Sequence, residues 1–310
     1  MEEINHEHKR KHNMKAIVTG GAGFIGHHLV KKLISKGWFV HILDNLSTGS
    51  LDNLEGLPSD MFEFHNVDLV YDVIPDIEDI SIIYHLAAPV SVPESLENPA
   101  KYRWAILDGS AKLLKWARIN EVGIFIAAST AALYGEPTKL PIKETSIPDP
   151  LSPYARYKFD MEKTMSNRHI PSLKCTALRF FNVFGEGQRD TGGYVSAVPI
   201  FLGQYESFQP ITVTGDGLQT RDWIYVGDVV DALIKSSKVK TYWKRKMPIY
   251  NVGSGIETSV IEVAEAFGGE IVHIASRKEP SRSVADITSI TEALDWKPKT
   301  SLLSWIKEVK

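Results

Sequence analysis

The chain has 310 residues, of which 43% are hydrophobic and 24% charged, a composition typical of a globular protein with one large domain or two closely packed ones. Its net charge of −3 excludes electrostatic attraction to nucleic acid or an anionic membrane as the main interaction, and no segment is apolar for long enough to predict a membrane span. The only cysteine, Cys175, lies in an apolar run and is interpreted as a core residue. An internal disulfide is therefore impossible, and we expect a cytoplasmic protein.

Residues 1–13 are polar and charged and contain His6, His8 and His12. These histidines lack the fixed spacing and the neighbouring acceptors of a metal site, so we expect a disordered extension and assign no metal. The segment also lacks the apolar core of a signal peptide.

The segment 15–26 predicts a strand, a tight turn and a helix. Its apolar run stops at Gly20, Gly23 and Gly26, which are spaced three apart, and an apolar helical pattern then continues to Gly37. The first glycine permits the turn, the second lets a pyrophosphate approach the backbone, and the third lets helix and strand pack closely. Free N–H groups and the helix dipole would hold the anion, so this turn predicts a dinucleotide site.

A second β-like run, 38–43, ends in Asp44, 18 residues after Gly26. A carboxylate at this position can accept both ribose hydroxyls of adenosine and repels a 2′-phosphate, which favours NAD over NADP. The alternative interpretation is that Asp44 only caps the turn at 45–49.

The rest of the chain predicts a doubly wound α/β sheet of the Rossmann type, because β-like and helix-like runs alternate. Strands are expected at 61–67, 80–86, 123–128 and 173–178, and helices at 100–120 and 153–168. The pattern loosens after residue 179, where 223–226 and 249–252 are expected to rejoin the main sheet. We therefore predict a disordered extension at 1–13, a dinucleotide-binding domain at 14–181 with 222–252 returning to it, and a smaller C-terminal α/β lobe at 182–221 and 253–310.

Two segments carry candidate catalytic groups. Ser129 and Thr130 end one predicted strand, and Tyr154 and Lys158 lie on one face of a predicted helix. The Lys158 ammonium and an oxidised nicotinamide would both lower the pKa of the phenol, making it a usable general base near neutral pH. Thr130 could share a hydrogen bond with the same substrate hydroxyl. Tyr-x-x-x-Lys also occurs by chance on amphipathic helices, so the prediction depends on the dinucleotide turn and the Ser-Thr pair.

The ordered motifs resemble an extended short-chain dehydrogenase/reductase of the sugar-nucleotide epimerase/dehydratase family, from about residue 14 to residue 310. They are Gly20-Gly21-Ala22-Gly23-Phe24-Ile25-Gly26, His85-Leu86-Ala87-Ala88, Ser129 to Gly135, Pro153 to Lys158, Leu178 to Gly185, Gly215 to Asp222, Asn251 to Gly255, and Ala285-Asp286.

The resemblance implies a role for each matched residue. Thr130, Tyr154 and Lys158 would be catalytic. The cofactor, NAD, would be bound by Gly20, Gly23, Phe24, Ile25, Gly26, Asp44, Asn45, Asp68, Leu86, Ala87, Ala88, Tyr154 and Lys158. The nucleotide sugar would be bound in the smaller lobe and beside the catalytic strand by Ser129, Thr130, Asn182, Arg221, Arg277, Arg282 and Ser283. Either Arg277 or Arg282 would supply the second cation for the diphosphate, and surface solvation is the alternative for all three arginines.

The residues after Thr130 indicate the subfamily. Family dehydratases carry Asp-Glu there, decarboxylases Ser-Glu, and epimerising reductases Cys and His, whereas this chain has Ala131 and Ala132. Alanines supply neither an acid nor a base for elimination. The resemblance thus implies an NAD-dependent UDP-hexose 4-epimerase that acts through a 4-keto intermediate. The alternatives are another nucleotide-sugar enzyme of the family (an oxidoreductase, decarboxylase or dehydratase) or a catalytically silent NAD-binding protein.

Three further expectations follow from the resemblance. Ile106 replaces an Asn that the family usually has, so any hydrogen bond of that Asn to cofactor or water is lost. The family dimerises through two helices per subunit, so a homodimer is expected, with Leu107, Leu114 and Met161 facing either the partner or their own sheet. Ser283 replaces a bulky aromatic residue of hexose-restricted epimerases, which implies room for a 2-acetamido group, although Ser283 could merely bond a neighbouring strand.

Overall fold

A computed structural model describes residues 14–310, except 168–172, 190–195, 240–246 and 277–278. Its centre is a seven-stranded parallel sheet in the order β10-β6-β5-β4-β1-β2-β3. The strands are β1 (Lys15–Thr19), β2 (Phe39–Asp44), β3 (Phe62–Asn66), β4 (Ile82–His85), β5 (Ile124–Thr130), β6 (Lys174–Phe180) and β10 (Ile249–Val252). The predicted doubly wound fold is confirmed.

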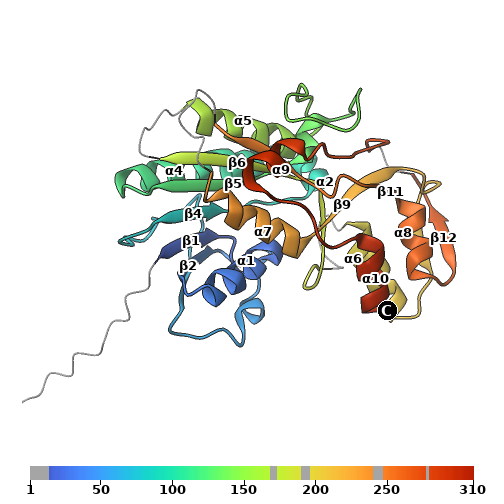
Figure 1. The fold of residues 1–310 in the computed structure, drawn as a ribbon, viewed down its shortest axis with the longest axis horizontal. Coiled ribbons are helices and arrows are strands. Elements are labelled where there is room, and N and C mark those ends of the chain that lie inside the picture. The colour runs from blue at the N-terminus through green and yellow to red at the C-terminus, as the bar shows by residue number, and fades with distance from the viewer. Residues whose placement is uncertain (1–13, 168–172, 190–195, 240–246, 277–278) are drawn as a thin grey trace, which may run out of the picture.

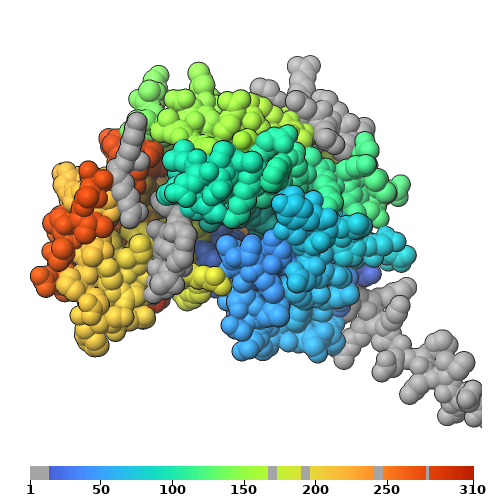
Figure 2. All heavy atoms as spheres, turned by 180° about the vertical axis from the view of Figure 1, so that it is seen from behind, coloured from blue at the N-terminus to red at the C-terminus, as the bar shows by residue number. Residues whose placement is uncertain are grey.

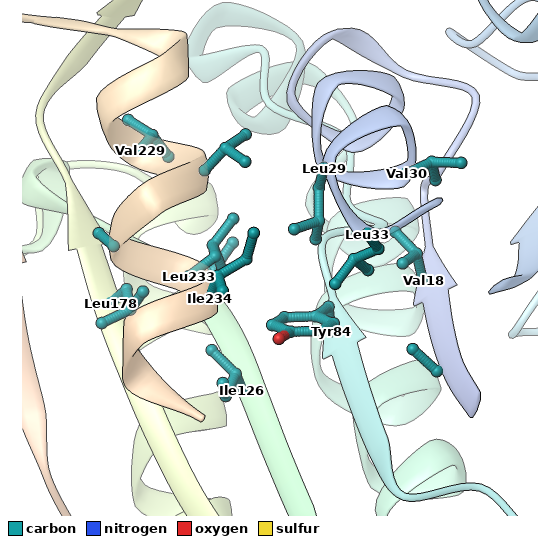
Figure 3. Close-up of a cluster of buried hydrophobic side chains, with 14 of the residues drawn as sticks. Val18, Leu29, Val30, Leu33, Tyr84, Ile126, Leu178, Val229, Leu233 and Ile234 are labelled. Carbon is teal, nitrogen blue, oxygen red and sulfur yellow. The ribbon is translucent and has the colours of Figure 1, made fainter. Parts of the chain in front are cut away.

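Helices cover both faces of this sheet (Figure 1). One face carries α1 (Phe24–Ser35) and α7 (Val226–Ser236), which pack side by side. Leu29 and Leu33 of α1 meet Leu233 and Ile234 of α7 above Tyr84 of the sheet (Figure 3). Two segments almost 200 residues apart therefore close one core.

The other face carries α4 (Gly109–Ile119) and α5 (Pro153–Asn167). Short helices precede α4: α2 (Val92–Glu97), α3 (Pro99–Tyr102) and a π-helical turn, η2 (Arg103–Asp108). Leu114 and Met161 are buried in this core, so they face their own sheet and cannot form the dimer seam, while Leu107 is half-buried.

A smaller lobe contains two short sheets. One has the order β11-β9-β7 and the other pairs β12 with β8. The strands are β7 (Asn182–Phe184), β8 (Ile211–Thr214), β9 (Thr220–Tyr225), β11 (Glu257–Ser259) and β12 (Ile271–Ile274). Helices α6 (Ala197–Glu206), α8 (Val260–Phe267) and α10 (Leu302–Val309) enclose its core around Phe184 and Trp305.

The predicted place of residues 223–226 is wrong. Residues 223–225 belong to β9, which pairs in parallel with β7 and antiparallel with β11 instead of rejoining the main sheet, and Val226 begins α7. The neighbouring prediction is confirmed, because β10 pairs with β6 at the edge of the main sheet. Helix α9 (Thr288–Leu294) then packs beside β10.

The two parts of the molecule flank an indentation of the surface, which is visible from the back between the blue sheet region and the yellow lobe (Figure 2). Among the described residues, no helix is both long and apolar enough to cross a bilayer.

Candidate active site

The glycine turn brings three chain segments into close contact. Gly20 has a φ of +70°, and a Cβ there would lie 2.8 Å from the backbone N of Ala87. A Cβ on Gly26 would lie only 2.0 Å from the carbonyl O of Gly20. The first and third glycines are thus required for the turn and for the approach of α1 to β1, as predicted.

The first turn of α1 is open to an anion. Gly23 is the N-cap residue and provides no side-chain cap, and the half-buried Phe24 and Ile25 follow it in the first turn. A helix N-terminus of this kind presents free N–H groups and the positive end of the helix dipole.

Asp44, Asn45 and Asp68 come together at the carboxyl ends of β2 and β3. The buried Asp44 carboxylate accepts hydrogen bonds from the backbone N–H of Ala22 at 3.0 Å and of Leu46 at 2.9 Å. Asn45 donates a hydrogen bond to Asp68 at 2.9 Å. The Asp44 carboxylate therefore links the second strand to the glycine turn, and each of its oxygens keeps a lone pair for a further donor.

Leu86, Ala87 and Ala88 follow β4 and lie half-buried beside Gly20. The backbone N–H of Ala87 donates to the Thr19 hydroxyl at 3.2 Å. That hydroxyl is also 2.8 Å from Nδ1 of His85. The buried side chains of Thr19 and His85 therefore hold the segment after β4 that carries Ala87.

His85 belongs to a sequence motif, but no role was assigned to it from the sequence. In the structure it is part of a chain of hydrogen bonds. Its Nε2 lies 2.8 Å from the Ser110 hydroxyl, which donates to the carbonyl O of Ile106. Burial, followed by the charge of Lys158, lowers the pKa of His85 to about 3, so the ring is neutral. The donors then run in one direction, from Thr19 through His85 to Ser110, which assigns the proton to Nε2.

Thr130, Tyr154 and Lys158 are brought together between β5 and α5. Thr130 ends β5, and its hydroxyl hydrogen-bonds the Tyr154 side chain. The Lys158 ammonium donates to the carbonyl O of Ala128 in β5 at 2.8 Å. All three side chains are buried, with Tyr154 9% exposed.

The sequence led us to expect that Lys158 lowers the pKa of the Tyr154 phenol. Of the groups that the structure describes, only Thr130 has this effect. Burial raises the pKa of Tyr154, and the hydrogen bond from Thr130 lowers it by less. Burial also lowers the pKa of Lys158 to about 8, against the opposing effect of Glu162. Desolvation therefore outweighs the neighbouring groups for both side chains.

Sequence reasoning missed a buried ion pair beneath this group. Arg179 of β6 and Glu162 of α5 form two hydrogen bonds, at 2.7 and 3.0 Å, and their side chains are 3% and 2% exposed. The Ser129 hydroxyl donates to the same Glu162 at 2.5 Å. Ser129, predicted to bind substrate, thus has its hydroxyl engaged inside the protein.

The π-helical turn explains how Ile106 is accommodated. Ile106 is 1% exposed and joins the core that contains Tyr154. The turn packs against α5. An apolar side chain therefore packs in the core beside α5, at the position where the resemblance leads us to expect an amide.

The predicted diphosphate ligands lie in the smaller lobe, and two of them already pair with carboxylates. Arg221 of β9 lies 2.8 Å from Glu279, and Arg282 forms an ion pair with Glu257. An incoming diphosphate would have to compete with these carboxylates. The half-buried Asn182 begins β7 beside β9, whereas Arg277 lies outside the described residues.

The buried carboxylate of Asp222 ties this region together. It accepts hydrogen bonds from the backbone N–H of Gly255 at 2.9 Å, from that of Ala285 at 3.0 Å and from the Ser254 hydroxyl at 2.8 Å. The segment that carries the half-buried Ser283 is thereby held against β9.

Residues 16–253 match the model of the NAD dependent epimerase/dehydratase family. A putative UDP-glucose 4-epimerase of Methanocaldococcus jannaschii is 37% identical, over 94% of this chain and 96% of that protein. UDP-glucuronic acid decarboxylase 1 of Arabidopsis thaliana is 33% identical, over 93% of this chain and 67% of that protein.

A solved structure shows the same fold. The UDP-N-acetylglucosamine 4-epimerase from Methanobrevibacter ruminantium M1, in complex with UDP-N-acetylmuramic acid, has a TM-score of 0.87 and 30% identity. The alignment covers 96% of both chains.

Proposed function

The chain belongs to the NAD dependent epimerase/dehydratase family, and on that premise we propose that it is an isomerase that inverts C4 of a UDP-hexose. The observation that carries this proposal is the buried group of Thr130, Tyr154 and Lys158 followed by Ala131 and Ala132. Ala131 is half-buried and Ala132 exposed, and both present only methyl groups next to Thr130.

The cofactor of this family, NAD, fits the residues present. The turn at Gly20 and Gly26 has no room for a Cβ, and the first turn of α1 lacks a side-chain cap. We assign the diphosphate of NAD to this turn and the adenosine ribose to Asp44. When bound, NAD supplies a reversible hydride acceptor.

The chemistry that remains for the protein is proton transfer and positioning. We assign Tyr154 as the base that takes the proton of the 4-hydroxyl, while the C4 hydride would pass to bound NAD. Tyr154 then returns the proton to the same oxygen when the hydride would be restored to the opposite face of C4. Thr130 holds the phenol, and Lys158 is held in place by Ala128. Because two alanines follow Thr130, no acid or base stands there for elimination of water or loss of the sugar carboxylate.

The direct test is product analysis. The purified protein is incubated separately with UDP-glucose, UDP-N-acetylglucosamine and UDP-glucuronate, and the products are separated by ion-exchange chromatography and identified by NMR. We expect C4 epimers of the hexoses and no release of carbon dioxide from UDP-glucuronate. A decarboxylated or dehydrated product, or no turnover of any of these sugars, would contradict the proposal.

We further propose that the 2-acetamido sugars are accepted, because Ser283 is small and half-buried in a segment held against β9. Removing a clash permits binding, and the serine hydroxyl can bond the amide. The variant Ser283→Tyr should lose activity on UDP-N-acetylglucosamine and keep activity on UDP-glucose. Ser207→Tyr, at an exposed serine after α6, is the matched control and should keep both activities. An equal loss of both activities in Ser283→Tyr, or no change in either, would remove this role.

A further inference from the structure

Two histidines and a glutamate gather on β2 and β3, at the edge of the main sheet. In the parallel register His41 pairs with Glu63, and Leu43 pairs with His65. Side chains two residues apart on a strand point to the same face. His41, Glu63 and His65 therefore share one face, which is the face that carries the α4 and α5 core.

Their donor atoms have the spacing of a metal site. Nδ1 of His41 lies 3.1 Å from Nε2 of His65 and 3.5 Å from a carboxylate oxygen of Glu63. The other oxygen of Glu63 lies 3.9 Å from Nε2 of His65. In a tetrahedral zinc site, bonds of about 2.0–2.2 Å place neighbouring ligand atoms ~3.3–3.6 Å apart. Among the residues that the structure describes, this is the one group of three histidine, cysteine or acidic side chains so arranged.

The surroundings favour a cation. The three side chains line a cavity of about 310 Å³ together with Lys15, Asp76, Ile77 and Glu78. This lining contains three carboxylates against one ammonium, and the ammonium of Lys15 donates to the carbonyl O of Glu78 and lies 3.9 Å from Asp79. The cavity gives a metal ion a route from solvent and room for a water as a fourth ligand.

A plain histidine–glutamate ion pair explains the cluster less well. An ion pair joins two groups, whereas one donor atom from each of the three side chains lies within 4.8 Å of the other two. Imidazole nitrogens and a carboxylate oxygen are the atoms that divalent zinc takes as ligands.

We propose that His41, Glu63 and His65 form a divalent metal site, in which the three side chains bind zinc and a water is the fourth ligand. The site lies on the strand that ends in Asp44 but is separate from the nucleotide-sugar site. It does not depend on the proposed epimerase activity, so its test needs no turnover.

The test is calorimetric titration of the full-length protein with zinc chloride in a buffer that does not chelate metals. The background protein carries His6→Asn, His8→Asn and His12→Asn, because these histidines could also bind zinc. We expect one equivalent of zinc with a dissociation constant below about 10 µM. Loss of a group that only hydrogen-bonds to a metal ligand weakens metal affinity about 10–100-fold. Substitution of a ligand itself should weaken zinc binding by at least that factor.

Two variants report on the site. His41→Ala removes a buried ligand, whereas Glu63→Gln changes a side chain that is 57% exposed and should leave the fold intact. His273→Ala, in β12 of the other lobe, is the matched control and should bind zinc like the background protein. Circular dichroism verifies folding of each variant. The proposal is overturned if the background protein takes up no zinc, or if folded Glu63→Gln binds zinc as tightly as the background does.

Discussion

The buried pair of Glu162 and Arg179 allows a quantitative prediction. The variant Glu162→Gln preserves the shape of the side chain but removes its charge. Arg179 would then keep only the hydroxyl of Tyr134, at 2.7 Å, and the carbonyl O of Glu144, at 3.3 Å, besides the new amide. Burial lowers the pKa of the Arg179 guanidinium. The Glu162 carboxylate is the main group that raises this pKa, through its hydrogen bonds and its charge.

The expected loss is large because water does not screen this pair. The two side chains are 2% and 3% exposed. Removing one partner of a buried pair leaves an uncompensated charge and costs about 3–5 kcal/mol in the free energy of unfolding. On the same helix, Asp160→Asn is the control, because it breaks ion pairs with the exposed Arg156 and Lys163 and should cost less than about 1 kcal/mol.

The assay is urea unfolding followed by circular dichroism, with all variants at the same NAD concentration. A double variant, Glu162→Leu with Arg179→Met, removes both charges and should recover most of the lost stability. Glu162 also raises the pKa of Lys158, so activity of Glu162→Gln should fall more near pH 8 than at pH 6.5. A loss as small as that of Asp160→Asn would refute the reasoning.

Three further predictions concern the proposed function. Tyr154→Phe should bind NAD and substrate but lose about 10²–10⁴-fold in turnover, measured in the coupled epimerase assay, and near-normal turnover would exclude Tyr154 as the base. Asp44→Asn should narrow a preference of the wild type for NAD over NADP in calorimetry, whereas equal wild-type affinities would remove the role of Asp44. The protein should be a C2 homodimer at micromolar concentration by light scattering, and Trp104→Glu, at a 45% exposed side chain near the half-buried Leu107, should shift it towards monomer; a monomeric wild type would contradict this.

The sequence predicted those parts of the fold that local patterns determine. The glycine spacing, the carboxylate at Asp44 and the Tyr154–Lys158 pair each depend on nearby positions in the chain. The structure places the glycine turn and Asp44 at the ends of the adjacent strands β1 and β2, and it places Tyr154 and Lys158 on α5 beside β5. Order along the chain is sufficient here, because parallel strands joined by helices place their carboxyl ends at one edge of the sheet.

Other features could not be predicted because they depend on pairing across the chain. The apolar pattern of β9 indicates a strand but does not select its partner, so its place beside β7 and β11 was missed. Arg179 and Glu162 are polar residues in an apolar strand and an amphipathic helix, and only the packed structure reveals their contact. The contribution of burial to the phenol pKa was also not predicted, since the depth of burial is not visible in a motif.

The late position of β10 in the chain matters while the protein is being made. β6 is complete at Phe180, but the strand that covers its outer edge begins at Ile249 and ends at Val252. At a synthesis rate of about 5–20 residues per second, that edge waits roughly 4–14 s for its partner. Helix α7, which closes the core over α1, also emerges within this interval. The growing chain therefore carries an open strand edge and an uncovered apolar face on the ribosome, where chaperones can bind it.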